Sequence, residues 1–151
     1  MRWRDWYGDG SLLVGEIALA CCALEVAAAL PDPTPPPRPE LVEGPPFPEP
    51  LSPFPEPVEG QRTAIIVSGT VTDRLAPAVL ALIDAGAEAG LRPTVISFGA
   101  CAASGGPYWD SYAVTKGVDQ LVPVDIYVPG CPPTPDALAA VLDNLVGRVV
   151  P

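Results

Sequence analysis

The sequence predicts an α/β fold in which a parallel β-sheet is covered by helices on both faces. Three short, β-branched apolar runs alternate with segments that have helical spacing. The runs are apolar at nearly every position, which is typical of strands buried on both faces. Strands and helices in alternation favour parallel strands joined by crossover helices.

The alternation begins where the composition changes, after a proline-rich stretch. The closing helix has the clearest ends, with Thr134 as N-cap, Pro135 at the first position and Gly147 as terminator. The expected strands cover 63–70, 93–101 and 121–131, and the expected helices cover 73–90, about 109–116, and 134–147.

An apolar run over residues 11–30 is expected to form an N-terminal helix. Because Arg2 and Arg4 precede it, this run also resembles a membrane span or a lipoprotein signal. Glu16 and Glu25 argue against both, since a carboxylate in a spanning helix costs about 2.5–3.5 kcal/mol on insertion scales. We therefore expect a soluble or peripheral protein.

Residues 31–61 are expected to form a disordered, Pro/Glu-rich linker. The motif PFPEP occurs at 46–50 and again at 53–57, and PELVEG at 39–44 is echoed by PEPVEG at 55–60. Such repeats supply neither a hydrogen-bonding ladder nor enough apolar surface for a core. A proline-rich ligand for a binding module is the alternative interpretation.

The charge and composition exclude some classes of function. The formal net charge is -10, and an acidic chain lacks the basic face that nucleic acid requires. The chain has no histidine, so it lacks the commonest proton carrier at neutral pH. Proton chemistry would then come from carboxylates or from a partner.

Four cysteines are the strongest candidates for chemistry. Cys101 follows the second expected strand and Cys131 follows the third, so both should lie at the edge of the sheet where parallel strands end. A helix that carries Cys21 and Cys22 would complete a four-sulfur site by packing over that edge. Buried small apolar residues are the alternative interpretation of all four.

The spacing of these cysteines favours an iron–sulfur cluster over a disulfide or zinc. Consecutive Cα atoms lie about 3.8 Å apart, below the roughly 4.4–6.8 Å of a normal disulfide. Structural zinc sites usually use two close pairs, whereas Cys101 and Cys131 are far apart in the chain. Four thiolates are the usual ligands of a 4Fe–4S cluster, and adjacent cysteines can reach different irons.

The segments LACCALE, GTVTDRLAP, SFGACAASGG and YAVTKGVDQLVPVDIYVPGCPPTPDAL resemble the B subunit of bacterial respiratory complex I, the PSST-type subunit of NADH-quinone oxidoreductase. The resemblance covers residues 11–30 and 62–147, and the VPVDIYVPGCPP block is highly specific. The adjacent cysteines distinguish this family from the small subunits of nickel-iron hydrogenases, whose first two ligands are spaced C-x-x-C.

The resemblance implies a flavodoxin-like subunit that holds one 4Fe–4S cluster through Cys21, Cys22, Cys101 and Cys131. In that family the cluster is the last in the path from NADH and reduces a quinone, which binds against a 49-kDa-type large subunit. A ferredoxin-like subunit and membrane-arm subunits are the other implied partners, on the cytoplasmic side of the bacterial membrane. Glu25 matches the family glutamate after the cysteine pair and is either a helix carboxylate or part of coupled protonation.

The chain departs from its relatives after the cysteine pair. Relatives continue with methionines, a Tyr-Asp and Arg-Phe-Gly region and then SPRQAD, whereas this chain has Val26, Ala27 and the proline repeats. In the family, the missing part lines the quinone chamber. The alternatives are a subunit of a related complex with ferredoxin or another donor, and a structural or assembly paralogue without a cluster. The expected organisation is a cluster-binding helix (11–30), the linker (31–61) and an α/β iron–sulfur domain (62–148).

Overall fold

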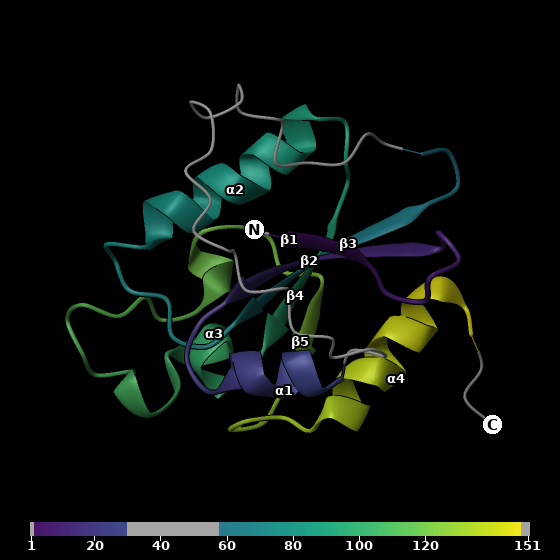
Figure 1. Ribbon diagram of the computed structural model, residues 1–151. Helices are drawn as coiled ribbons and strands as arrows, with labels where there is room; N and C mark the ends of the chain where they lie inside the picture. Colours follow the sequence, from purple (N-terminus) through teal and green to yellow (C-terminus); the bar gives the residue numbers. More distant parts are fainter. Residues whose placement is uncertain (1, 30–57, 149–151) are drawn as a thin grey trace, which may run out of the picture.

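The computed structural model of the chain describes residues 2–29 and 58–148. A five-stranded sheet has the order β1-β2-β3-β4-β5, and its strands are parallel except for β1, which pairs antiparallel with β2 (Figure 1). The strands are β1 (Arg2–Asp5), β2 (Leu12–Ala18), β3 (Arg62–Ser68), β4 (Thr94–Phe98) and β5 (Ile126–Val128). The helices are α1 (Cys22–Ala28), α2 (Ala76–Glu88), α3 (Ala100–Ser104) and α4 (Pro135–Val146), with 3-10 turns at Gly106–Tyr108 and Val118–Gln120.

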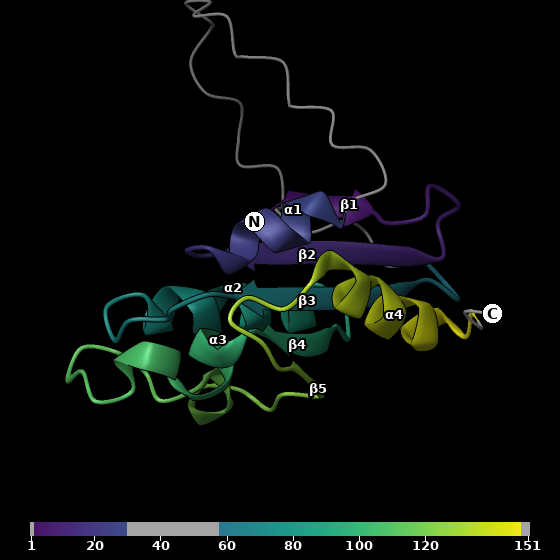
Figure 2. The same cartoon turned by 90° about the horizontal axis from the view of Figure 1, so that it is seen from below.

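Helices cover both faces of the sheet. Figures 1 and 2 show α1 and α4 on one face and α2 on the other. In β3, Ala64 and Ile66 belong to the core cluster beneath α1 and α4, whereas Ile65 and Val67 belong to the cluster beneath α2. Because both faces are buried, β3 is apolar at consecutive positions, and the predicted α/β fold is confirmed. The strands follow one another in chain order, unlike the 2-1-3-4-5 order of flavodoxin.

The expectation of one helix over residues 11–30 was wrong. Residues Leu12–Ala18 form β2, which pairs in parallel with all seven residues of β3, and only Cys22–Ala28 form the helix α1. A short apolar run does not reveal whether it is a buried strand or a buried helix. Here residues 12–18 form a strand because their backbone is hydrogen-bonded to β3.

Two elements expected farther along the chain also differ. The structure has no helix at 109–116; instead Asp73 N donates to Ala113 O at 3.0 Å and Thr115 N donates to Val71 O at 3.0 Å. The strand expected over 121–131 is confined to Ile126–Val128. Prolines at 123 and 129 flank it, and proline lacks the N–H that a ladder requires.

The helices expected at 73–90 and 134–147 are confirmed as α2 and α4. The side chain of Thr134 accepts a hydrogen bond from Ala137 N at 3.3 Å, and Gly147 ends α4 in the left-handed conformation. The proline-rich linker lies outside the described residues except for 58–61, which lead into β3.

The strand β1 and its connection to β2 were not anticipated from the sequence. The carboxylate of Asp5 accepts hydrogen bonds from Gly8 N at 3.0 Å and Gly10 N at 2.8 Å, which closes the turn. Tyr7 then donates its hydroxyl to Asp143 of α4 at 2.6 Å. The N-terminal hairpin is therefore tied to the helix at the other end of the chain.

Candidate metal centre

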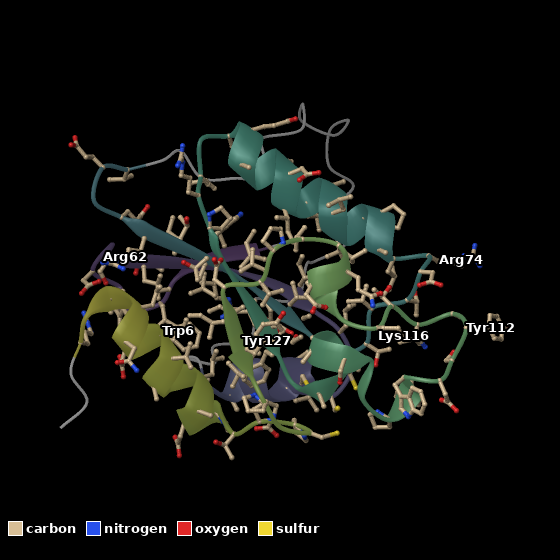
Figure 3. The ribbon with its side chains drawn as sticks, turned by 180° about the vertical axis from the view of Figure 1, so that it is seen from behind. Trp6, Arg62, Arg74, Tyr112, Lys116 and Tyr127 are labelled. Atoms are coloured by element: carbon tan, nitrogen blue, oxygen red, sulfur yellow. The ribbon has the colours of Figure 1, made fainter. Side chains whose placement is uncertain are left out.

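All four cysteines lie at the carboxyl edge, which is the edge of the sheet where β2, β3, β4 and β5 end. Cys21 and Cys22 follow β2, Cys101 follows β4 and Cys131 follows β5. None of the four forms a disulfide. Figure 3 shows the sulfur atoms gathered in one part of the molecule, beside α1 and α3.

A tight turn carries the chain from β2 into α1. Leu19 N donates to Ser68 O at 2.9 Å, so the turn lies directly over the end of β3. A Cβ atom at Gly69 would lie 1.7 Å from the Leu19 carbonyl oxygen, which leaves room only for glycine. Ala20 adopts a left-handed conformation, with φ 57°, and Cys21 follows as the N-cap of α1. The turn thus places the adjacent cysteines at the carboxyl edge.

Gly99 is the point at which three cysteine-bearing segments meet. A Cβ atom there would lie 2.7 Å from Cys22 Sγ, 3.5 Å from Pro133 Cδ and 3.6 Å from Gly130 O. Gly99 itself adopts φ 93° and ψ 162°, a conformation that only glycine adopts readily. Because Gly99 also begins α3, the segments of Cys22, Cys101 and Cys131 share one small space.

Backbone hydrogen bonds hold the second and third of these segments together. Gly99 N donates to Val128 O at 2.9 Å, and Ala100 N donates to Gly130 O at 2.8 Å. Cys101 lies on α3, and a Cβ atom at Gly106 would lie 2.8 Å from its Sγ. Gly106 therefore lies directly beside the Cys101 sulfur, and Gly130 immediately precedes Cys131.

The other three cysteines lie close enough to Cys22 to affect the pKa of its thiol. Burial raises the pKa of the Cys22 thiol to about 11, and the neighbouring side chains of Cys21, Cys101 and Cys131 raise it further as negative charges or hydrogen-bond partners. The Cys22 thiol is therefore protonated at neutral pH when nothing is bound. A metal ligand must be a thiolate, so binding at Cys22 would release a proton.

The four candidate ligands are all cysteine thiols, the usual donors to an iron–sulfur cluster. Within residues 2–29 and 58–148, no three Cys, Asp or Glu side chains come together closely enough to hold one metal ion. A tetrahedral zinc site, with Zn–S bonds near 2.3 Å, would need sulfurs about 3.8 Å apart. A 4Fe–4S cluster is usually held by four cysteine thiolates.

The four cysteines differ in exposure. Cys22 and Cys101 are buried, whereas Cys21 and Cys131 are exposed. Glu25, on α1, is half-buried and has no ion-pair partner among the described residues.

Sequence reasoning missed two polar residues near the carboxyl edge. Glu16 of β2 is partly buried, and burial raises its carboxyl pKa, although Arg4 and a hydrogen bond with Ser68 act in the opposite direction. Ser68 is fully buried at the end of β3. The sequence does contain a signal for Glu16, which is a carboxylate within an otherwise apolar run. From the sequence alone, it serves only as an argument against a membrane span.

No helix in the described part of the chain is long and apolar enough to cross a membrane. A chain of the archaeal membrane-bound sulfane sulfur reductase, a respiratory membrane complex, is 28% identical to this one with a TM-score of 0.48. That alignment covers 58% of this chain and 52% of the other.

Curated relatives have similar sequences over most of this chain. The NADH-quinone oxidoreductase B subunit numbered 2 in Streptomyces griseus is 49% identical over 134 residues, which are 89% of this chain and 51% of the relative. The NADH-quinone oxidoreductase B subunit numbered 1 in Salinispora tropica is 50% identical over 137 residues, which are 89% of this chain and 64% of the relative. The chain thus spans between half and two thirds of the length of these relatives.

A family model agrees with this similarity. The model described as NADH ubiquinone oxidoreductase, 20 Kd subunit, matches residues 21–145, a range that contains all four cysteines. The chain belongs to this family, which includes the B subunits of respiratory complex I.

Proposed function

We propose that the chain is an electron-transfer subunit of an NADH-quinone oxidoreductase and holds one 4Fe–4S cluster through Cys21, Cys22, Cys101 and Cys131. Membership of the family supports the class of enzyme. The observation that supports the cluster assignment most is the space at Gly99, where Cys22 Sγ lies beside the segments that carry Cys101 and Cys131. The activity would belong to the assembled complex and not to this chain alone.

The residues of the chain would act mainly by holding the cluster and excluding water. Cys22 and Cys101 are 2% and 7% exposed, so two corners of the site are already shielded by the core. Gly99 and Gly106 let the backbone lie close to the sulfurs of Cys22 and Cys101, and close backbone groups tune the reduction potential of a cluster. When bound, a 4Fe–4S cluster accepts and gives up one electron at a time.

The quinone would bind between this chain and a 49-kDa-type large subunit. Reduction of a quinone to a quinol requires two electrons and two protons. The chain contains no histidine, so a partner would supply most of the proton chemistry. A ferredoxin-like subunit and membrane-arm subunits would be the other partners, and the chain would lie peripherally on the cytoplasmic side of the membrane.

Anaerobic reconstitution of the full chain with iron and sulfide tests the cluster assignment. Low-temperature electron paramagnetic resonance of the dithionite-reduced protein should show a cubane signal, with four irons per chain. Cys101→Ser and Cys131→Ser should each lower bound iron and shift or abolish that signal, because each removes one of the four thiolates.

Deletion of residues 33–58 is the control, since it removes no cysteine and should leave the signal in place. Unchanged iron content in both serine variants would refute the ligand assignment. Absence of any cubane signal in the unmodified chain would favour a structural paralogue without a cluster.

A further inference from the structure

The opposite edge of the sheet, where β3 and β4 begin, contains a cavity that the cysteine site does not use. Its volume is about 410 Å³, within the usual range for ligand sites, and its lining includes Arg62, Arg92, Thr94, Leu91 and Leu145. In Figure 3, Arg62 and Arg74 lie on opposite sides of the molecule. The cysteine site lies at the other end of the strands, so it does not account for this cavity.

Two arginines occupy equivalent positions in this cavity. Ala64 of β3 lies opposite Thr94 of β4, and each arginine lies two residues before one of this pair. Arg62, at the start of β3, and Arg92, in the loop before β4, are both exposed and both line the cavity. Two cationic residues from the starts of neighbouring strands thus line one cavity.

Neither arginine has an ion-pair partner among the described residues, and no carboxylate lines the cavity. This is unexpected, because the chain has 18 acidic residues and only 8 basic ones. Two cations that line one space repel each other, and an anion bound between them would relieve that repulsion. The charge arrangement therefore indicates an anionic ligand.

The surroundings indicate that the anion carries an apolar group. Val58, Leu91 and Leu145 form an apolar wall of the same cavity. A second hollow, of about 370 Å³, shares Arg62 and Leu145 and continues past Ile126 and Val141 along α4. A ligand with its charged end at the arginines would thus find apolar surface on both sides of Leu145.

We propose that this edge binds the phosphate of a phospholipid headgroup between Arg62 and Arg92, with the adjoining apolar part of the lipid along Leu145. Guanidinium groups match the geometry of phosphate oxygens by forming two parallel hydrogen bonds. Thr94 lines the same space, and its hydroxyl would be a further donor. The inference does not depend on the cysteine site.

Calorimetric titration of the full chain with short-chain dihexanoyl phosphatidylglycerol, below its micelle concentration, tests the proposal. Arg62→Gln combined with Arg92→Gln should weaken binding about tenfold or more, because two charge-assisted contacts are lost. Arg92→Gln alone should weaken it less and keeps the test usable if the double variant does not fold. Arg74→Gln, at an exposed arginine just before α2, is the matched control and should leave the affinity unchanged.

Inorganic phosphate and Val58→Ser separate the lipid from a free anion. The lipid should bind more tightly than phosphate alone, and Val58→Ser should weaken binding of the lipid but not of phosphate, since Val58 belongs to the apolar wall. Equal affinity for phosphate and lipid would overturn the lipid assignment. Lipid binding that is absent, or that survives the loss of both arginines, would overturn the site.

Discussion

The four cysteines of the carboxyl edge form two pairs that differ in their surroundings. The inner pair, Cys22 and Cys101, is 2% and 7% exposed, and Cys22 belongs to the core cluster beneath α1 and α4. The outer pair, Cys21 and Cys131, is exposed. Each outer cysteine is held by its local backbone, Cys21 as the N-cap of α1 and Cys131 in the loop before α4.

The difference shows that the fold provides one wall of the site and leaves the other open. Packing of the core sets the positions of the inner sulfurs, so they are in place once the chain folds. The outer sulfurs depend on turns that face solvent or a partner. Changes at the inner pair should therefore reduce both folding stability and iron binding, whereas changes at the outer pair should reduce iron binding alone.

The largest effect on stability is expected for Gly99→Ala, which acts on the inner wall. Its Cβ would lie 2.7 Å from Cys22 Sγ, and its backbone conformation suits only glycine. We expect a loss of about 2–5 kcal/mol in the free energy of unfolding, from backbone strain and overpacking together. Denaturant unfolding of the iron-free chain measures this loss, and iron content after reconstitution should fall as Cys22 is displaced.

Gly147→Ala is the matched control for this substitution. Gly147 also has a positive φ, of 76°, but a Cβ atom there meets nothing within 4 Å. It should cost only about 1–2 kcal/mol, from the left-handed backbone, and leave iron binding unchanged. If the two variants lost the same stability, crowding at Cys22 would have no part in the result.

Replacement of one cysteine from each pair tests the comparison directly. Cys22→Ser places a hydroxyl in the core and should lower the free energy of unfolding of the iron-free chain by about 1–3 kcal/mol. Cys131→Ser, at an exposed position, should change it by less than about 0.5 kcal/mol. Both variants should lose bound iron. Equal stability losses would show that exposure does not distinguish the pairs.

The positions of Cys101 and Cys131 could be predicted from the sequence because a general rule places them. Residues that follow parallel strands share one edge of the sheet, and the sequence marked the ends of β4 and β5 with glycine. The caps of α4 were predictable for a similar reason, since Thr134 and Gly147 act through local backbone geometry. Local signals of this kind do not depend on the rest of the fold.

The strand β2 and the hairpin before it could not be predicted in this way. Residues 12–18 become a strand because β3 supplies a partner for their backbone, and that partner lies about fifty positions away in the sequence. The role of Gly69 depends on the same long-range pairing, because only the fold brings the Leu19 carbonyl onto it. The adjacent cysteines were therefore expected on a long helix, whereas they follow a strand and a tight turn.

A smaller effect than that of Cys22→Ser is expected from a substitution at Glu16, which lies near the carboxyl edge and leaves every cysteine unchanged. One of its carboxylate oxygens is buried without a hydrogen-bond partner, and burial raises its pKa above the usual 4.5. The folded state thus holds the Glu16 proton more tightly than the unfolded state does. The stability from this proton is fully present below pH 4.5 and is lost as the pH rises through the folded-state pKa.

Glu16→Gln should therefore stabilise the iron-free chain at pH 7 by up to about 1 kcal/mol, because glutamine stays neutral where the buried carboxylate is charged. The gain should disappear near pH 4, where Glu16 is itself protonated. Glu88→Gln, at an exposed position of α2, is the control and should change stability by less than about 0.5 kcal/mol at both pH values. A gain of the same size at pH 4 and pH 7 would mean that packing, and not the buried charge, distinguishes glutamine from glutamate here.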